Sequence, residues 1–425
     1  MTAYSCMTRE ELEREYASVL ASYNHTKAQG LNLNMARGKP ATQQLDLVSD
    51  ILTTLTSVED CFDGNIDARN YGELAGLPSA RAYWADILGC KAEEIFVGGA
   101  ASLNMMFDIV SRAYSHGLLH SPRPWCKEEK VKFLCPAPGY DRHFQIGEFY
   151  GAELIYIPMT ETGPDMDMIE EYVKDPAVKM LWVVPKYSNP DGVIFSDETI
   201  RRIAALKAAA PDFAIIWDNA YCIHEFKGEY VEFPDIISLC AEAGNPDMVF
   251  EFASTSKVTF AGGGVSCMAA SVANIKYFTG VFGVQMISYD KVNQLRHVRY
   301  LKDKVHTLEI MKRHASVMAP KFECVAKWLN EKIAPLDIAH WTDPKGGYFV
   351  SLYAMPGTAQ RIWQLCKEAG VVLTNAGAAY PYRKDPNDSH LRIAPSLPPV
   401  EDLEKAMEVL TTAMKLSALE KLLNK

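Results

Sequence analysis

A single lysine, Lys257, lies in the stretch ASTSKVTFAGGGVS (residues 253–266), among small residues and glycines. A surface lysine usually has charged or polar neighbours, so this setting is unusual. A lysine whose pKa is lowered exposes a free amine, which can form a Schiff base with a carbonyl cofactor. Small neighbours would leave room for a bulky cofactor, and glycines would let the backbone approach it closely. Taken alone, however, Lys257 would be interpreted as a surface lysine.

Polar side chains recur where other apolar segments end. Asn189 follows one such segment in PKYSNPDG, and Asp218 and Tyr221 follow another in IIWDNAY. Each has an ordinary structural explanation: Asn-Pro-x-Gly is usually a turn, an aspartate after a strand is most often a cap, and a tyrosine is often a core residue. Only their combination with Lys257 predicts a cofactor-binding catalytic site.

That combination fits pyridoxal 5′-phosphate (PLP), which needs a lysine and an acid paired with its pyridinium nitrogen. Asp218 could be the acid, since its charge would keep the ring protonated. Asn189 and Tyr221 could donate hydrogen bonds to the phenolic oxygen. In CPAPGYDRHF, Tyr140 could give the ring an aromatic platform, although it could equally be an unrelated turn residue.

The phosphate of such a cofactor needs backbone N–H groups at the start of a helix. VGGAASLNMMFDIV offers a strand end, a glycine-rich turn and an apolar helical run, although such turns are common. The hydroxyls near Lys257 could add donors. The residues predicted to surround the phosphate are Gly99, Ala100, Ala101, Ser102, Ser254 and Ser256.

The elements that would position these residues alternate along the chain. From about residue 80, short and almost wholly apolar segments alternate with amphipathic ones, including SDETIRRIAALKAAA with Ser196 or Asp197 as its cap. This pattern predicts a mostly parallel sheet covered on both faces, with sites at the carboxyl ends of its strands. The last third predicts long helices, then short strands and a closing helix, typical of a smaller α+β domain. The segment LNLNMARGKP is isolated from the sheet and could join it.

Composition, net charge and cysteine spacing exclude several classes of protein. The 425 residues are 48% hydrophobic, and the net charge is −10 with scattered basic residues, which argues against nucleic-acid binding. Ten cysteines form no C-x-x-C pair and no metal-binding pattern, so we expect a protein of the reducing cytoplasm without a metal. The N-terminal segment shows no signal core but a capping box at Thr8 and Glu11, which predicts a helix running towards Gly30. No apolar run is long enough for a membrane helix.

Taken together, these motifs resemble the fold type I PLP-dependent aminotransferases of the aspartate aminotransferase superfamily. RGKP, NYGELAGLPSAR, DNAYCIHEF, STSKVTFAGGG and DKVNQLRHVR resemble a bacterial subgroup, Ic, which is also related to the aminotransferase-like domains of MocR regulators. The resemblance implies an α/β fold: a large PLP-binding domain (46–300) with a mostly parallel seven-stranded sheet flanked by helices, and a smaller α+β domain formed by 1–45 and 301–425.

The resemblance also assigns roles. Lys257 would be the Schiff-base lysine and proton shuttle, Asp218 the partner of the pyridine nitrogen, and Tyr140 the stacking ring. Asn189 and Tyr221 would bind the phenolic oxygen. Arg392, in HLRIAP, matches the arginine that binds the substrate α-carboxylate, a task suited to its forked donors.

Two further assignments concern the edges of the site. Tyr71 matches a tyrosine that reaches the phosphate in the neighbouring subunit, which implies a homodimer with shared active sites. Arg37 and Gly38 match the segment that covers the substrate, and Arg37 is the candidate for the distal carboxylate. Both Tyr71 and Arg37 could instead be ordinary loop residues.

The chain departs from the family pattern at the phosphate. Many members carry an arginine eight residues after the lysine, where this chain has Val265, and the phosphate loop has Ala100 and Ala101 where hydroxyl or amide side chains are common. Phosphate would then rely on hydroxyls, backbone or another cation. We therefore expect weaker PLP retention but an intact lysine, acid and arginine.

The expected activity is transamination between an L-amino acid, best aspartate or glutamate, and a 2-oxo acid, with ping-pong kinetics. Two alternatives stay open at this stage. The same fold hosts PLP-dependent lyases and decarboxylases. A MocR-like regulator would bind PLP without catalysis, but only about 30 residues precede LNLNMARGKP, too few for the expected DNA-binding module.

Overall fold

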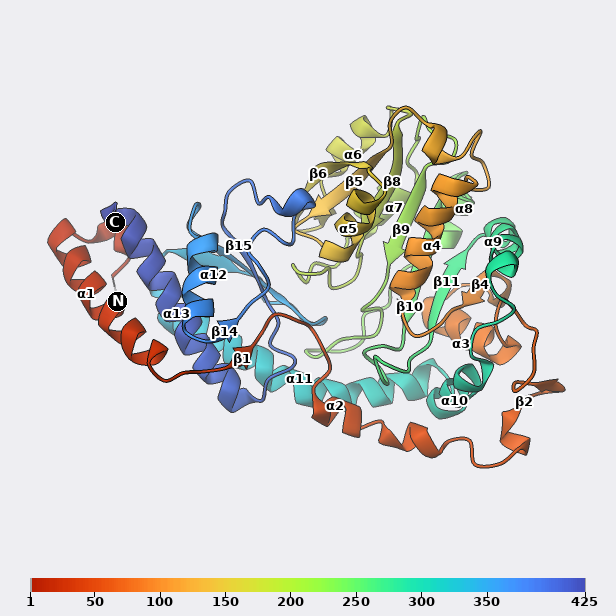
Figure 1. Ribbon diagram of the computed structural model, residues 1–425, viewed down its shortest axis with the longest axis horizontal. Coiled ribbons are helices and arrows are strands. Elements are labelled where there is room, and N and C mark those ends of the chain that lie inside the picture. Colours follow the sequence, from red (N-terminus) through yellow and green to blue (C-terminus); the bar gives the residue numbers. More distant parts are fainter. Residues whose placement is uncertain (1, 425) are drawn as a thin grey trace.

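An eight-stranded mixed sheet forms the centre of the protein (Figure 1), whose computed structural model describes residues 2–424. Its strand order is β4-β11-β10-β9-β8-β5-β6-β7, and the neighbouring strands from β6 to β10 are parallel. β11 runs antiparallel to both of its neighbours. The strands are β4 (Ile95–Val97), β5 (Lys132–Ala137), β6 (Glu153–Thr160), β7 (Gly163–Pro164), β8 (Val178–Val183), β9 (Ala214–Asp218), β10 (Val249–Ser254) and β11 (Ser266–Ala270).

The prediction of a mostly parallel sheet is confirmed, with one strand more than the seven expected. The additional strand, β7, has two residues and folds back against β6 as an antiparallel edge. The central strands β8 and β9 are buried along their whole length, as expected of strands covered on both faces.

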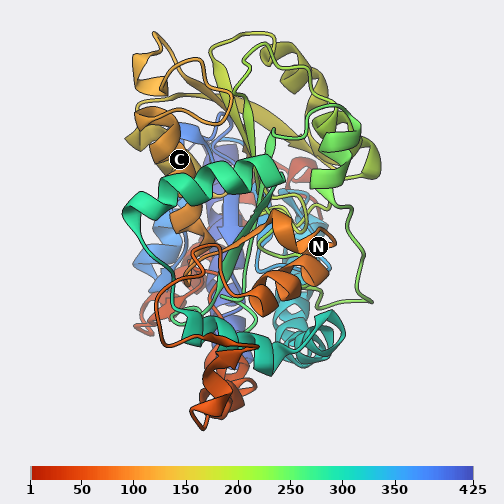
Figure 2. The same ribbon diagram turned by 90° about the vertical axis from the view of Figure 1, so that its right-hand side faces the viewer.

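Helices cover both faces of this sheet. The predicted cap of one of them is confirmed, because the Ser196 side chain accepts a hydrogen bond from the Thr199 backbone N–H; this helix ends at Ala204, earlier than its apolar pattern suggested. Helix α9 lies on the side of the molecule opposite the two termini, and Figure 2 shows it in front. The helices are α3 (Pro78–Leu88), α4 (Ser102–Ser115), α5 (Asp141–Phe149), α6 (Met166–Tyr172), α7 (Asp197–Ala204), α8 (Ile236–Glu242), α9 (Val272–Gln285) and α10 (Lys291–Leu301).

The remaining elements pack around small sheets beside the large one. β12 (Ala339–Trp341), β13 (Val350–Ala354) and β15 (His390–Ile393) form an antiparallel sheet. β1 (Leu33–Asn34) pairs in parallel with β14 (Val371–Val372), so the LNLNMARGKP segment joins this part of the chain. β2 (Phe62–Asp63) and β3 (Ile66–Asp67) form a separate hairpin. The helices here are α1 (Arg9–Lys27), α2 (Thr42–Asp46), α11 (Lys304–Lys332), α12 (Ala359–Glu368) and α13 (Val400–Leu423).

The N-terminal helix packs with the C-terminal part of the chain. Thr8 and Glu11 form the predicted capping box at the start of α1. Leu12, Val19 and Tyr23 are buried in one apolar cluster with residues of α12 and α13. Helix α11 spans both parts, because Ile310 packs with the large sheet and Phe322 with the small one. The division at residues 46 and 301 stays a prediction.

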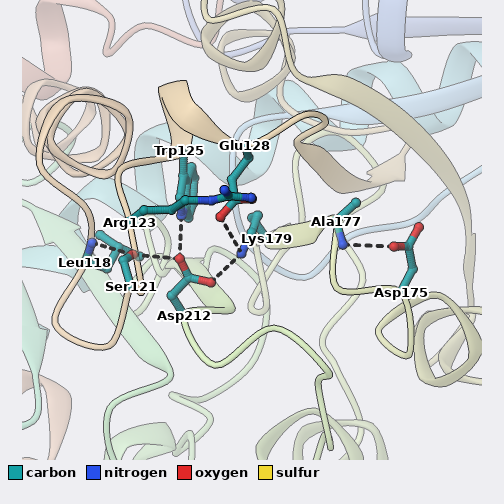
Figure 3. A network of polar contacts seen from close by, with 9 residues as sticks. All are labelled: Leu118, Ser121, Arg123, Trp125, Glu128, Asp175, Ala177, Lys179 and Asp212. Carbon is teal, nitrogen blue, oxygen red and sulfur yellow. Dashed lines mark hydrogen bonds and ion pairs between the residues drawn. The ribbon is translucent and has the colours of Figure 1, made fainter.

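A buried polar network fixes the amino-terminal end of the large sheet (Figure 3). Asp212, just before β9, accepts hydrogen bonds from Lys179 Nζ at 2.7 Å, Trp125 Nε1 at 2.8 Å and Ser121 Oγ at 2.6 Å. Both carboxylate oxygens are therefore satisfied, as a buried charge requires. The carboxyl ends of the same strands, at the opposite edge, carry the predicted site residues. No helix among residues 2–424 is long and apolar enough to cross a membrane.

Candidate active site

A cavity of about 850 Å³ opens at the carboxyl ends of the central strands. It is bounded on its other side by the β1 segment and by residues around β14 and β15. Almost every predicted site residue lines it, and only Gly99, Ala100 and Tyr71 do not. The predicted residues in the lining are Arg37, Gly38, Ala101, Ser102, Tyr140, Asn189, Asp218, Tyr221, Ser254, Ser256, Lys257 and Arg392.

Lys257 follows β10 and faces this cavity. Its Nζ lies 5.0 Å from the centre of the Tyr221 ring and 5.8 Å from that of the Tyr348 ring. Burial lowers the pKa of the Lys257 amine, and the charge of Asp218 opposes this effect without cancelling it. A neutral amine is a nucleophile and a base, so the setting suits the predicted role of Lys257.

Asp218, at the end of β9, is buried and has one free oxygen. Its Oδ2 lies 3.0 Å from His143 Nε2, whereas Oδ1 has no hydrogen-bond partner among the described residues. A buried carboxylate oxygen without a partner is rare and calls for a donor. The N–H of a protonated pyridine ring is such a donor, so this acid fits PLP.

Two tyrosines complete the polar surroundings. Tyr140 stands at the start of α5 and meets the His143 ring edge to face at 5.0 Å. Burial raises the pKa of Tyr140 to about 12 and that of Tyr221 well above its usual value. Both phenols therefore keep their protons at neutral pH and can donate hydrogen bonds.

The residues predicted to hold the phosphate lie at the start of α4 and around the end of β10. Its N-cap residue, Ala101, provides no side-chain cap, so the first amides of the helix stay available for an anion. Ser254 Oγ donates to Ser256 Oγ at 3.1 Å, and Ser256 Oγ donates to the Ala100 carbonyl at 3.0 Å. Ala100 and Gly99 lie behind the lining rather than in it, and Gly99 accepts a hydrogen bond from Ser266 Oγ at 2.7 Å.

Val265 faces away from this cradle. It is buried in the apolar cluster on one face of the large sheet, and its N–H donates to Thr255 Oγ1 at 2.9 Å. The position at which the family resemblance implies an arginine thus holds a core residue here. Among the described residues that line the cavity, hydroxyls and amides provide the donors at the cradle.

Arg392, on β15, is held by several partners. Its Nη1 lies 3.2 Å from Asp141 Oδ1 and 3.3 Å from Asn189 Oδ1, and Nη2 donates to Thr374 Oγ1 at 3.3 Å. The guanidinium lies 4.9 Å from the centre of the Phe349 ring. These contacts orient the charge at the cavity wall, as an anchor for a carboxylate requires.

The edges of the cavity carry further cations. Arg37 is exposed and has no hydrogen bond or ion pair from its side chain within residues 2–424, and Arg142 and Arg383 also contribute to the lining. Gly38 is required by packing, since a Cβ there would lie 2.6 Å from the Phe349 ring. Tyr71 lies outside the cavity of its own chain and is 80% exposed.

Several residues of the site were not predicted. His143 lies inside the CPAPGYDRHF segment, three residues after Tyr140, and a ring aimed at Asp218 could have been considered there. Asp141, the partner of Arg392, is in the same segment. Gln44, His314 and Tyr348, which are connected behind Lys257, had no local signal because they come from distant parts of the chain.

Sheet order and the lysine after β10 fit an enzyme of the fold type I class. The sequence model of the family described as Aspartate amino-transferase matches residues 7–425. The chain is 46% identical over 405 residues to an aspartate aminotransferase of Corynebacterium glutamicum, covering 95% of this chain and 94% of that one. It is also 47% identical to a protein of Mycolicibacterium smegmatis whose name describes it as an aminotransferase, with 99% of both chains covered. The chain belongs to the aspartate aminotransferase family.

Solved structures of aminotransferases share the fold of this chain. The crystal structure of an aspartate transaminase from Corynebacterium glutamicum superposes with a TM-score of 0.95 at 46% identity, with 98% of each chain covered. An α-aminoadipate aminotransferase from Thermus thermophilus, complexed with N-(5′-phosphopyridoxyl)-L-leucine, has the same fold at 22% identity and a TM-score of 0.72, with 98% of this chain and 100% of that one covered. The protein is an aminotransferase, and the lyase and regulator alternatives are not favoured.

Proposed function

We propose that this aminotransferase uses PLP and exchanges amino groups between aspartate or glutamate and a 2-oxo acid. The observation that best supports PLP as the cofactor is the free Oδ1 of Asp218. It lies in the same cavity as the Lys257 amine, whose pKa is lowered by burial. PLP, when bound, supplies an electron sink for the bonds at the substrate Cα. The product of the first half-reaction leaves before the second substrate binds, which gives ping-pong kinetics.

The residues of this chain then have defined tasks. Asp218 would pair with the ring nitrogen, Tyr140 would stack on the ring, and Asn189 and Tyr221 would bind its phenolic oxygen. The first amides of α4 with Ser102, Ser254 and Ser256 would hold the phosphate. Lys257 Nζ would take the proton from the substrate Cα and return it at the cofactor.

Support for an acidic substrate comes from charge. Arg392 would bind the α-carboxylate, and Arg37, which has no partner of its own in residues 2–424, would bind the distal carboxylate with Gly38 beside it. The name of the Corynebacterium relative points to the same substrate. A cavity wall with several cations favours a dianion over a neutral amino acid.

Assembly and location belong to the same proposal. The exposed Tyr71 would reach the phosphate of a second copy, making a homodimer with shared active sites. All ten cysteines are unpaired, which suits the reducing cytoplasm.

The first test is the absorbance spectrum of the purified protein, before and after addition of aspartate, beside Lys257→Ala. We expect a visible band that aspartate shifts in the wild type, and no lysine-linked band in the variant. A band that responds only to another amino acid would refute the aspartate assignment. Absence of any band after PLP is supplied would refute the use of PLP.

A further inference from the structure

His224 is a buried histidine whose two ring nitrogens have no hydrogen-bond partner among the described residues. It follows β9 in the segment DNAYCIHEF, and none of the proposed catalytic roles uses it. Buried polar atoms are nearly always paired, so two unpaired nitrogens on one ring need an explanation.

The ring borders a small cavity of about 10 Å³ that is separate from the candidate active site. Gln44, His314 and Tyr348 line the same cavity. A space of roughly 10–15 Å³ is the least that holds one water molecule. A water there has the Tyr348 hydroxyl and the His224 ring as polar partners, and two such partners meet the second condition for a stable buried water.

The neighbours of the cavity are already oriented. Gln44 Nε2 donates to His314 Nδ1 at 3.3 Å and to the Tyr348 hydroxyl oxygen at 3.1 Å. His314 Nε2 then donates to the Val258 carbonyl at 3.1 Å. The Tyr348 hydroxyl proton remains free to donate to a water, and that water can also accept the ring N–H of His224, which leaves the other ring nitrogen as an acceptor.

This group is connected to Lys257 through two tyrosine rings. Val258 follows Lys257 in the chain, and Lys257 Nζ and the His224 ring pack against the same two stacked tyrosines. Nζ is 5.0 and 5.8 Å from the Tyr221 and Tyr348 rings, and the His224 ring is 5.7 and 6.2 Å from them. Burial and the charge of Lys257 lower the pKa of His224, which keeps the ring neutral and able to accept a hydrogen bond.

The backbone of His224 is held in place by the loop that contains Gly346 and Gly347. Gly347 N–H donates to the His224 carbonyl at 3.0 Å. A Cβ on Gly346 would lie 2.6 Å from the same oxygen, so only glycine allows this approach. The loop that carries Tyr348 is thereby held against His224.

We propose that His224, Tyr348 and one water in the cavity behind them form a polar shell that holds the amine of Lys257 while it carries the substrate Cα proton. His224 is thus a positioning residue for proton transfer. A protonated amine in this buried place needs an acceptor, and a neutral imidazole supplies one without adding a negative charge. The inference rests on the proposed role of Lys257 as proton carrier.

The test compares His224→Phe, His224→Gln and Tyr348→Phe with the wild type. His224→Phe removes the acceptor and keeps a ring, whereas His224→Gln restores a polar side chain. We expect His224→Phe to lower kcat by about 10- to 100-fold with KM for the amino acid within about threefold, and the isotope effect from C2-deuterated substrate to rise. His224→Gln should recover most of kcat. His297→Gln, at a buried histidine bonded to Thr259, should change neither quantity.

A second readout uses the apoenzyme. Acylation of Lys257, followed by mass spectrometry against pH, reports the pKa of its amine. Loss of the acceptor should move the midpoint about 1 lower in pH for His224→Phe, because the ammonium form loses stabilisation. The titratable and charged groups that face His224 are Lys186, Tyr221, Glu225, Lys257, His314 and Tyr348.

Each of these measurements can overturn the proposed role of His224. An unchanged isotope effect and an unchanged acylation midpoint in His224→Phe would overturn the proposal, as would a loss of kcat that His224→Gln does not restore. If His224→Phe does not fold, Tyr348→Phe decides: it removes the hydroxyl that donates to the water, so the isotope effect should rise, and an unchanged isotope effect would overturn the proposal. A wild type that does not exchange the Cα hydrogen with solvent deuterium would overturn the role of Lys257 as well. Normal exchange in every variant would overturn only the role of His224.

Discussion

Arg392 Nη1 lies 3.2 Å from Asp141 Oδ1, so the arginine assigned to the substrate carboxylate already has a carboxylate partner. The other oxygen of Asp141 accepts a hydrogen bond from Gln145 Nε2 at 3.4 Å. Both Asp141 and Arg392 line the active-site cavity. An incoming carboxylate therefore meets an arginine whose charge is partly neutralised, and a like charge beside it.

Replacement of Asp141 by asparagine tests this competition. The amide can still accept a hydrogen bond from Arg392 but carries no charge. We expect KM for aspartate, and the dissociation constant of succinate, to fall by about 3- to 10-fold with little change in kcat. Steady-state kinetics and a succinate titration measure both. Asp175→Asn, at a surface ion pair with Lys132, is the control for net charge. A higher KM in Asp141→Asn would mean that Asp141 mainly orients Arg392.

The buried network at the amino-terminal end of the sheet should contribute stability but not activity (Figure 3). Asp212→Asn leaves the buried Lys179 without its close charged partner. We expect a loss of about 3 kcal/mol in the free energy of unfolding, measured by urea denaturation. The kinetic constants of the folded enzyme should not change, because the proposed catalytic groups lie at the other end of the strands.

The exposed ion pair between Asp167 and Arg202 provides the matched control. Asp167→Asn removes the same charge from the surface, and we expect a change within about 0.5 kcal/mol. An equal effect of the two substitutions would contradict the importance of burial at Asp212.

Much of this architecture could be predicted from sequence because the strands are almost continuously apolar. Such segments have few alternatives in a protein of this size, and the carboxyl ends of parallel strands meet at one edge. Asn189, Asp218 and Lys257 could therefore be placed together from the order of the residues alone. The packing of LNLNMARGKP with the C-terminal part followed only from the family resemblance, since a two-residue strand has no periodicity of its own.

Contacts between distant side chains could not be predicted. Asp141 and Arg392 are 251 residues apart, and Gln44 and Tyr348 are 304 apart. No local pattern announces such a pair, because it depends on how two layers pack. For the same reason, the sequence showed that Val265 replaces an arginine but not that its side chain points into the core.

Glu251 makes the stability of the protein depend on pH. It is buried on β10, where Oε1 accepts a hydrogen bond from Asn219 Nδ2 at 2.8 Å and Oε2 has no partner in the described chain. Burial raises the pKa of Glu251 from 4.5 to about 8. The folded protein thus binds a proton that the unfolded chain releases, and stability falls as pH rises between these two values.

Glu251→Gln should remove this dependence, because the amide is neutral at every pH. We expect the variant to gain stability relative to the wild type between about pH 5 and pH 8, measured as the difference in urea midpoint. Glu161→Gln, at an exposed carboxylate, serves as the control. A constant difference between Glu251→Gln and the wild type over this range would show that Glu251 is charged in the folded protein.

The phosphate cradle gives the last prediction. Val265→Arg would introduce the arginine that the family resemblance implies, but the Val265 side chain lies in the apolar core. We expect it to destabilise the protein by roughly 3 kcal/mol or more without tightening PLP binding. Ala101→Thr, by contrast, adds a hydroxyl at the N-cap of α4. Ala101 lines the cavity, so the new hydroxyl can reach a bound ligand. The hydroxyl would donate to the phosphate, and this charge-assisted hydrogen bond should outweigh any competition of the hydroxyl oxygen for the first amides of the helix, so the Kd of PLP should fall by about 3- to 10-fold. Titration of the apoenzymes with PLP measures both, and tighter binding by Val265→Arg would show that the core rearranges to let an arginine reach the phosphate.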